Sequence, residues 1–377
     1  MTAAAVPLAA ARGANSEVTL GLVAAAALLP GVVLAVPAGL TADRMDRVRT
    51  MIAADVVRAV AVGAAALALA VGGLHPAALM ALAFVVGCGE TLFVTASQSF
   101  LPGLVADADL DHANGRLQAA TDAGREFAGP PLGSLAFRAV AWLPFGADAL
   151  TYAVSAVLLR KLPRRAPSQA PAGVPHDRGI GPAWRVIRQS RPLAGLAVGL
   201  MALSCCGAAV LALLVLLVTD DWQLDDGWFG LALTLVACGA TLAGVVAGYV
   251  RAHLSARVVL PLAVACNAGA YVVLGSAGAL AALPALVVWG AAVTLGNITS
   301  VGIRQRLVPS AVLGRVMGLF RAFIGAGGVV GATAAGFAAR SFGAGTVAVV
   351  AGLAQLPVVA LLAWVLPGAG DSPERTT

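Results

Sequence analysis

Long apolar segments recur along the whole chain, and they restrict its fold more than any other feature. A helix needs about 20 apolar residues to cross the hydrocarbon core of a membrane. Only 11% of the residues are charged, whereas soluble domains have about 25%. We therefore expect an all-α polytopic membrane protein embedded in the lipid bilayer. Eleven segments are long enough to span, at residues 18–40, 51–73, 77–101, 117–139, 141–160, 193–218, 228–250, 258–278, 281–303, 315–339 and 343–366.

The start of the chain differs from these spans. Residues 1–11 are apolar but short, since a helix that rises about 1.5 Å per residue covers only about half of the hydrocarbon core over this length. A polar turn from Arg12 to Glu17 follows. A cleaved signal peptide fits poorly, because no basic region precedes the apolar run. We expect the end of a first helix whose front part is missing.

The basic residues predict the orientation in the membrane. When successive loops are assigned to alternate sides, eighteen of the 24 Lys and Arg residues fall on one side and three on the other, with three inside spans. The positive-inside rule places the richer side in the cytoplasm. We expect a multi-pass protein of the plasma membrane with a cytoplasmic C-terminus. Because the basic residues lie in loops beside apolar spans, the net charge of +6 does not indicate binding to nucleic acid.

A dense charged loop at residues 39–49 separates two of the apolar segments, and it allows two interpretations. The loop could serve only to fix orientation. Alternatively it forms a cytoplasmic gate, with Gly39 permitting close backbone approach and Asp43 accepting hydrogen bonds at the N-terminus of a neighbouring helix. Arg44 and Arg47 would then pair with carboxylates at adjacent helix ends.

A polar stretch divides the spans into two halves. Residues 163–191 are rich in Pro, Gly and Arg and predict a cytoplasmic linker between an N-terminal helix bundle at 1–162 and a C-terminal bundle at 192–377. Within the linker, residues 184–188 either form a short amphipathic helix on the membrane surface or are solvated. The halves share a weak repeat, because Gly115-Arg116 and Gly314-Arg315 each precede a glycine-rich span.

Several motifs together resemble those of the major facilitator superfamily, and in particular its enterobactin-exporter-like branch. The resemblance covers nearly the whole chain and implies two six-helix bundles related by pseudo-two-fold symmetry, with transport by alternating access. The second-half counterpart of the charged loop, residues 248–253, departs from the pattern because Ala252 stands where Asp43 stands in the first half. The motifs are the charged loop, Leu29-Pro30, Asp55 with Arg58, residues 87–93, 113–116, 129–133, 144–149 and 304–309, and Gly314-Arg315-Val316.

Charged residues inside the spans are costly in hydrocarbon and are therefore candidates for proton coupling or substrate contact. Asp55 and Arg58 share a helix face, although a structural ion pair near the helix end is an alternative. Glu90 lies in mid-span beside two glycines, with no cation near it in the sequence. Burial favours the protonated form of such a carboxyl, which would let it carry a proton; a packing role is the alternative.

The remaining candidates in the spans come from three other predicted helices. We expect Arg321 to be the only charge within the spans of the second half, with a counter-ion from the first half. Asp148 follows a Pro-Phe pair and could instead cap local structure. The predicted span 117–139, which is the fifth helix when the short first one is counted, carries three charged residues at i, i+3 and i+4 spacing. They are Asp122, Arg125 and Glu126.

A proline and glycine motif follows that charged group. Gly129, Pro130 and Gly133 predict a helix that bends and packs closely. The motif resembles the core of the fifth-helix signature of antiporting exporters, whose upstream glycines are replaced here by Arg116 and Arg125. A simple packing kink is the alternative.

These features predict a secondary active transporter, and more specifically a proton-coupled exporter of a hydrophobic or amphipathic small molecule, siderophore or drug-like. The alternatives are an importer of a small metabolite and a membrane scaffold or sensor that does not transport. We expect that the protein is not an enzyme and needs no cofactor or metal, because the sequence lacks a nucleotide-binding loop and a metal-ligand cluster. We also expect a monomer. The five cysteines fall in apolar segments, where they serve as small packing residues.

Overall fold

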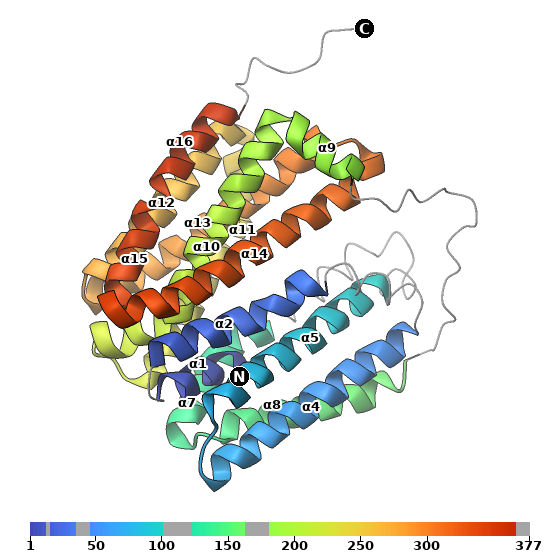
Figure 1. Cartoon of the computed structure of the whole chain (residues 1–377), viewed down its shortest axis with the longest axis vertical. Helices are drawn as coiled ribbons and strands as arrows, with labels where there is room; N and C mark the ends of the chain where they lie inside the picture. The colour runs from blue at the N-terminus through green and yellow to red at the C-terminus, as the bar shows by residue number, and fades with distance from the viewer. Residues whose placement is uncertain (13–15, 35–45, 101–122, 163–180, 367–377) are drawn as a thin grey trace, which may run out of the picture. The chain divides into compact units, whose positions relative to one another are not determined.

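The computed structural model describes residues 1–12, 16–34, 46–100, 123–162 and 181–366 (Figure 1). Within these ranges every regular element is a helix. Nine of the described helical segments are long and apolar enough to cross a membrane. Most of their ends lie within a few residues of the expected spans, as α12 (Ala256–Ser276) shows against the expected 258–278. The exception is α2, which ends at Val33 where the expected span ran to residue 40. The chain is therefore an integral, multi-pass membrane protein.

The first compact unit comprises residues 1–177 together with 224–234. In it, α4 packs between α5 and α8, and α5 also packs against α2 (Figure 1). The start of α11 (Asp226–His253) belongs to this unit. Its other elements are α1 (Thr2–Ala11), α2 (Ser16–Val33), α4 (Arg47–Val71), α5 (Pro76–Phe100), the π-helical turn η3 (Ala123–Ala128), α7 (Gly129–Ala139) and α8 (Leu143–Leu159).

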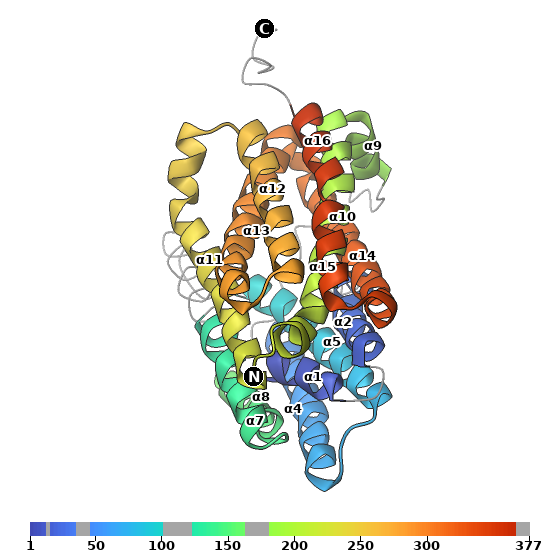
Figure 2. The ribbon, with the colours of Figure 1, turned by 90° about the vertical axis from the view of Figure 1, so that its left-hand side faces the viewer.

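The second compact unit comprises residues 178–223 and 235–377. In it, α12 packs against α13 and α15, and α10 packs against α14 (Figure 2). The expected span 343–366 is divided into two helices at Ala354 and Gln355. The helices added here are α9 (Gly181–Gln189), α10 (Arg191–Leu216), the π-helical turn η4 (Leu217–Asp221), α13 (Ala279–Leu307), α14 (Ser310–Phe342), α15 (Ala344–Leu353) and α16 (Leu356–Val365).

Helix α9 shows what part of the expected linker does. Ala183 and Ile187, four residues apart on one face, are buried in the core of the second unit. The Trp184 ring packs edge-on against Phe323, with ring centroids 6.2 Å apart. Residues 181–189 are thus an amphipathic helix packed on the second unit, while residues 163–180 lie outside the described part.

Helix α4, which carries the candidate charges, begins with a side-chain cap. The Asp46 carboxylate accepts hydrogen bonds from the backbone N–H groups of Val48 (2.9 Å) and Arg49 (3.2 Å). These N–H groups have no partner within the helix, so the cap satisfies them. The last part of the charged loop is therefore fixed by its own helix.

Replacing Asp46 by Ala should lower the free energy of unfolding by about 1 kcal/mol, because two backbone donors lose their acceptor. Unfolding by SDS titration in mixed micelles measures the change. Asp46→Asn is the matched control, since Asn caps helices about as well as Asp. Equal destabilisation by both substitutions would show that the charge of Asp46, and not its capping bonds, stabilises this end.

Candidate functional site

The charged loop lies mostly outside the described residues. Gly39, Asp43 and Arg44 are among those not described, and Arg47 is the first residue of α4. The proposed gate therefore stays a prediction. The described end of the loop shows only how it joins α4, through the cap formed by Asp46.

Three charged side chains meet between α4 and α5 inside the first unit. Arg58 on α4 donates from Nη2 to Asp55 Oδ1 one helical turn away. It also donates from Nη1 to Glu90 Oε2 on α5, at 2.8 Å. Asp55 and Arg58 are almost completely buried, whereas 34% of the Glu90 side chain is exposed. The cation that Glu90 lacks nearby in the sequence is thus supplied by another helix.

Two aromatic rings complete the surroundings of Arg58. Its guanidinium carbon lies 4.8 Å from the ring centroid of Phe93 and 4.6 Å from that of Tyr152. Such cation–π contacts favour a guanidinium that has lost most of its water. Neither residue was predicted as part of the site, although Phe93 ends the motif at residues 87–93. Phe93 follows Glu90 by one helical turn, and Tyr152 is one of only three tyrosines, so spacing and rarity were the available signals.

Two buried polar atoms in this cluster have no hydrogen-bond partner. They are Oδ2 of Asp55 and Nε of Arg58. A buried carboxylate oxygen or guanidinium nitrogen without a partner loses hydration with no compensation. These two atoms are complementary, since Nε and one Nη of an arginine can bind both oxygens of one carboxylate. The pair therefore has a second arrangement available to it.

Gly89 makes room for the Arg58 side chain. A Cβ atom at position 89 would lie 2.7 Å from Cγ and 2.9 Å from Cδ of Arg58. Both distances are shorter than van der Waals contact, so any larger residue at position 89 displaces the stem of this arginine. The glycine noted beside Glu90 in the sequence thus belongs to the charged cluster.

Replacing Gly89 by Ala should therefore lower the free energy of unfolding by about 1–3 kcal/mol, the usual cost of overpacking, and should also reduce transport. Thermal unfolding and substrate flux measure the two effects. Gly63→Ala on α4 is the matched control, because its Cβ would meet only Ala149 Cβ at 3.7 Å. If Gly89→Ala behaved like this control, Arg58 would not depend on the glycine.

The other candidates of the first unit fall in different places. Asp122 lies outside the described residues, and Arg125 and Glu126 lie in η3, so their pairing stays a prediction. Asp148 on α8 accepts a hydrogen bond at 2.6 Å from the backbone N–H of Thr2. Its carboxylate also lies 3.3 Å from the amine of Met1. Asp148 is thus separate from the Arg58 contacts described above.

The proline and glycine motif begins α7 directly after the π-helical turn η3. Such turns commonly mark bends in helices. The Ser134 hydroxyl donates to the carbonyl of Pro130 at 2.9 Å. The backbone of Gly230, in the part of α11 that belongs to the first unit, comes so close to Pro130 and Ser134 that a Cβ would overlap both. The motif therefore packs closely against this part of α11, and the bend that its glycines and prolines predict stays a prediction.

An arginine in the second unit corrects one expectation. Arg304 was assigned to a loop, but it lies inside α13 and only 4% of it is exposed. Its guanidinium donates to the Ser300 carbonyl and hydroxyl, both at 3.2 Å, and lies 4.7 Å from the ring centroid of Phe320. Arg321 is therefore not the only charge within the spans of this half. The Arg321 side chain is exposed, and its cross-half pairing stays a prediction.

The charged cluster and the helical fold together indicate a class of membrane protein. Buried charges on apolar spanning helices are the arrangement expected of a membrane transporter. Residues 1–332 match the Major Facilitator Superfamily, and the chain belongs to this family. It is a transporter for small molecules rather than an enzyme. No protein of curated function matches the sequence.

Solved structures support the fold. A mutant of the nucleoside transporter NupG superposes with a TM-score of 0.81 at 12% identity, covering 96% of this chain and 95% of that one. A bacterial homologue of the iron transporter ferroportin gives 0.73 at 16% identity, with coverages of 96% and 95%. The fucose:proton symporter FucP of E. coli, also a mutant, gives 0.57 at 14% identity, with 97% and 98%. At such identities the likeness establishes the fold alone, and it confirms the expected major facilitator fold.

Proposed function

We propose that this transporter exports a hydrophobic or amphipathic small molecule, siderophore or drug-like, while protons move inward. It acts as a monomer in the plasma membrane, with its C-terminus in the cytoplasm. Resemblance to the enterobactin-exporter branch supports the direction, and the positive-inside distribution supports the orientation. The contact of the partly exposed Glu90 with the buried Asp55–Arg58 pair is the observation that carries proton coupling.

In this proposal Arg58 has two arrangements. When Glu90 is ionised, the guanidinium is shared between Glu90 and Asp55, as the structure has it. When Glu90 takes up a proton, its attraction for Arg58 falls. Nε of Arg58 can then pair with Oδ2 of Asp55, which satisfies both unpartnered atoms and gives a pair with two parallel hydrogen bonds.

This rearrangement links the proton to the helices. Glu90 lies on α5 and Asp55 on α4, so protonation breaks a charged link between two helices and strengthens one within a single helix. A side chain with two discrete partners is the kind of element whose equilibrium a ligand can bias. In the same proposal Gly39, Asp43, Arg44 and Arg47 form the cytoplasmic gate. The charges at Asp122, Arg125, Glu126, Asp148 and Arg321 are secondary candidates for coupling or substrate contact.

Transport by vesicles of known orientation tests this function. Everted membrane vesicles that contain the protein should accumulate an amphipathic probe, such as ethidium or an iron-free catecholate siderophore, when their interior is made acidic. Dissipating the pH gradient should abolish the accumulation. Accumulation that persists without any ion gradient would contradict proton coupling, and gradient-driven uptake seen only in right-side-out vesicles would favour the importer. If neither orientation moves any compound of a broad panel, the scaffold interpretation gains.

A further inference from the structure

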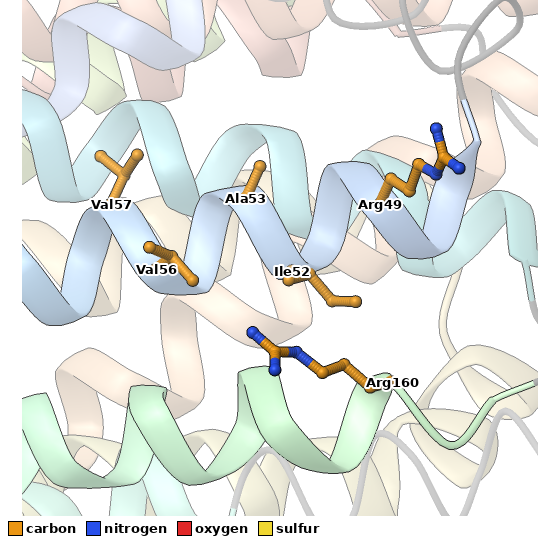
Figure 3. Close-up of a pocket in the computed structure, with 6 residues that line it drawn as sticks. All are labelled: Arg49, Ile52, Ala53, Val56, Val57 and Arg160. Carbon is orange, nitrogen blue, oxygen red and sulfur yellow. The ribbon is translucent and has the colours of Figure 1, made fainter.

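A surface pocket in the first unit is lined by other residues than the charged cluster around Arg58. It has a volume of about 600 Å³ and lies between α4 and the end of α8 (Figure 3). This volume falls within the range of about 300–1,000 Å³ that is common for small-molecule sites. The lining residues are Arg49, Ile52, Ala53, Val56, Val57 and Arg160.

The pocket uses a different face of α4 from the charged cluster. Counted from Arg49, the five lining residues on α4 lie at positions i, i+3, i+4, i+7 and i+8, which places them along one side of the helix. Asp55 and Arg58 belong to the buried set of the same helix. Val56 and Val57 are instead 43% and 50% exposed. A ligand in this pocket therefore does not compete for the coupling site.

The two charged residues that line the pocket are both arginines. Arg49 lies on α4 and Arg160 directly follows α8. Both border the same space, and their guanidinium groups point in different directions (Figure 3). The nearest acid to Arg49 is Asp46, at 3.7 Å, and 70% of the Arg49 side chain is exposed. Among the described residues no carboxylate pairs with Arg160. Two guanidinium groups with so little compensation favour an anion that accepts several hydrogen bonds, such as a phosphate.

The rest of the face is suited to hydrocarbon. Beyond the pocket the exposed residues of α4 are apolar, with Val60 68% exposed and Leu67 71% exposed. On α8, Val154 and Val157 are about half exposed. A ligand that matches both parts of the surface has an anionic head for the arginines and a long apolar tail for the valines and leucines. In a membrane, this describes an anionic phospholipid.

We propose that Arg49 and Arg160 bind the headgroup of an anionic phospholipid from two sides, with its acyl chain along Ile52, Ala53, Val56 and Val57. Arg49 lies in the first turn of α4, at the end of the charged loop, so the bound lipid holds this end of the helix at the membrane surface. The site is independent of the proposed direction of transport and of proton coupling.

Thermal unfolding of the purified full-length protein in micelles tests the site, with phosphatidylglycerol titrated against phosphatidylcholine. Phosphatidylglycerol should raise the unfolding temperature in a saturable manner and phosphatidylcholine should not. Removing a basic residue costs about fivefold in affinity for an anionic membrane lipid. The double variant Arg49→Gln/Arg160→Gln should therefore need about 30-fold more phosphatidylglycerol for the same effect.

Two further variants separate a lipid site from a general attraction to charge. Ala53→Phe fills the apolar pocket while leaving both arginines, and it should weaken the response to phosphatidylglycerol. Arg257→Gln removes an exposed arginine from the second unit and should respond like the wild type. The proposal is overturned if the double variant or Ala53→Phe responds like the wild type. It is also overturned if Arg257→Gln weakens the response as much as the double variant, or if inorganic phosphate alone reproduces the full effect.

Discussion

Replacing Arg58 by Met should lower the free energy of unfolding by about 3–5 kcal/mol, the usual cost of removing one partner from a buried ion pair. Met keeps most of the volume of the arginine stem, so the loss reports the charge and not a cavity. The reason is the burial of Asp55, of which only 1% is exposed. Without Arg58 this carboxylate has no cation beside it and must be protonated or hydrated. SDS titration in mixed micelles measures the loss.

The double variant Asp55→Asn/Arg58→Met separates charge from packing. Removing both members of a buried pair is often neutral for stability, so most of the lost stability should return in this variant. Transport should not return, because the proposed switch needs both groups. A single variant as stable as the wild type, or a double variant as unstable as the single one, would contradict the importance of the pair.

Replacing Glu90 by Gln should reduce gradient-driven transport to the level of vesicles without a gradient. Gln keeps the shape and a hydrogen-bond acceptor for Arg58 but cannot gain or lose a proton. Stability should fall by no more than about 2 kcal/mol, because one charge-assisted hydrogen bond becomes a neutral one. Flux in everted vesicles and unfolding in micelles measure the two effects separately.

Glu90→Asp is the matched control for this prediction. It keeps the ionisable group, so gradient-driven transport should survive at a reduced rate, since the shorter side chain weakens the contact with Arg58. Gradient-driven transport that is unchanged in Glu90→Gln would remove this residue from the mechanism. Arg58 would then have a structural role only.

The fold could be predicted from the sequence because spanning helices must be long and apolar. Every backbone polar group in hydrocarbon needs an internal partner, which leaves the helix as the solution for each apolar segment. The interruption of the last span at Gln355 could not be read in this way. Gln355 is fully buried and accepts a hydrogen bond at 2.8 Å from Asn267 on α12, a contact that depends on packing between helices distant in sequence.

The candidate site could be predicted only in part, for the same reason. Asp55 and Arg58 pair within one helix, and spacing alone indicates that they share a face. The contact of Arg58 with Glu90 joins two helices, and that with Tyr152 joins α4 to α8, so no local pattern contains them. Arg304 was misplaced because α13 extends to Leu307, beyond the apolar run from which its end was predicted.

Proton movement during transport tests the central claim most directly. The purified protein is reconstituted in liposomes that contain a pH-sensitive dye, and the compound identified in the vesicle experiment is supplied on one side. The wild type should move protons opposite to that compound, and Glu90→Gln should move the compound down its gradient with no proton movement. Compound flux without proton movement in the wild type, or equal proton movement in Glu90→Gln, would contradict the claim that Glu90 carries the coupled proton.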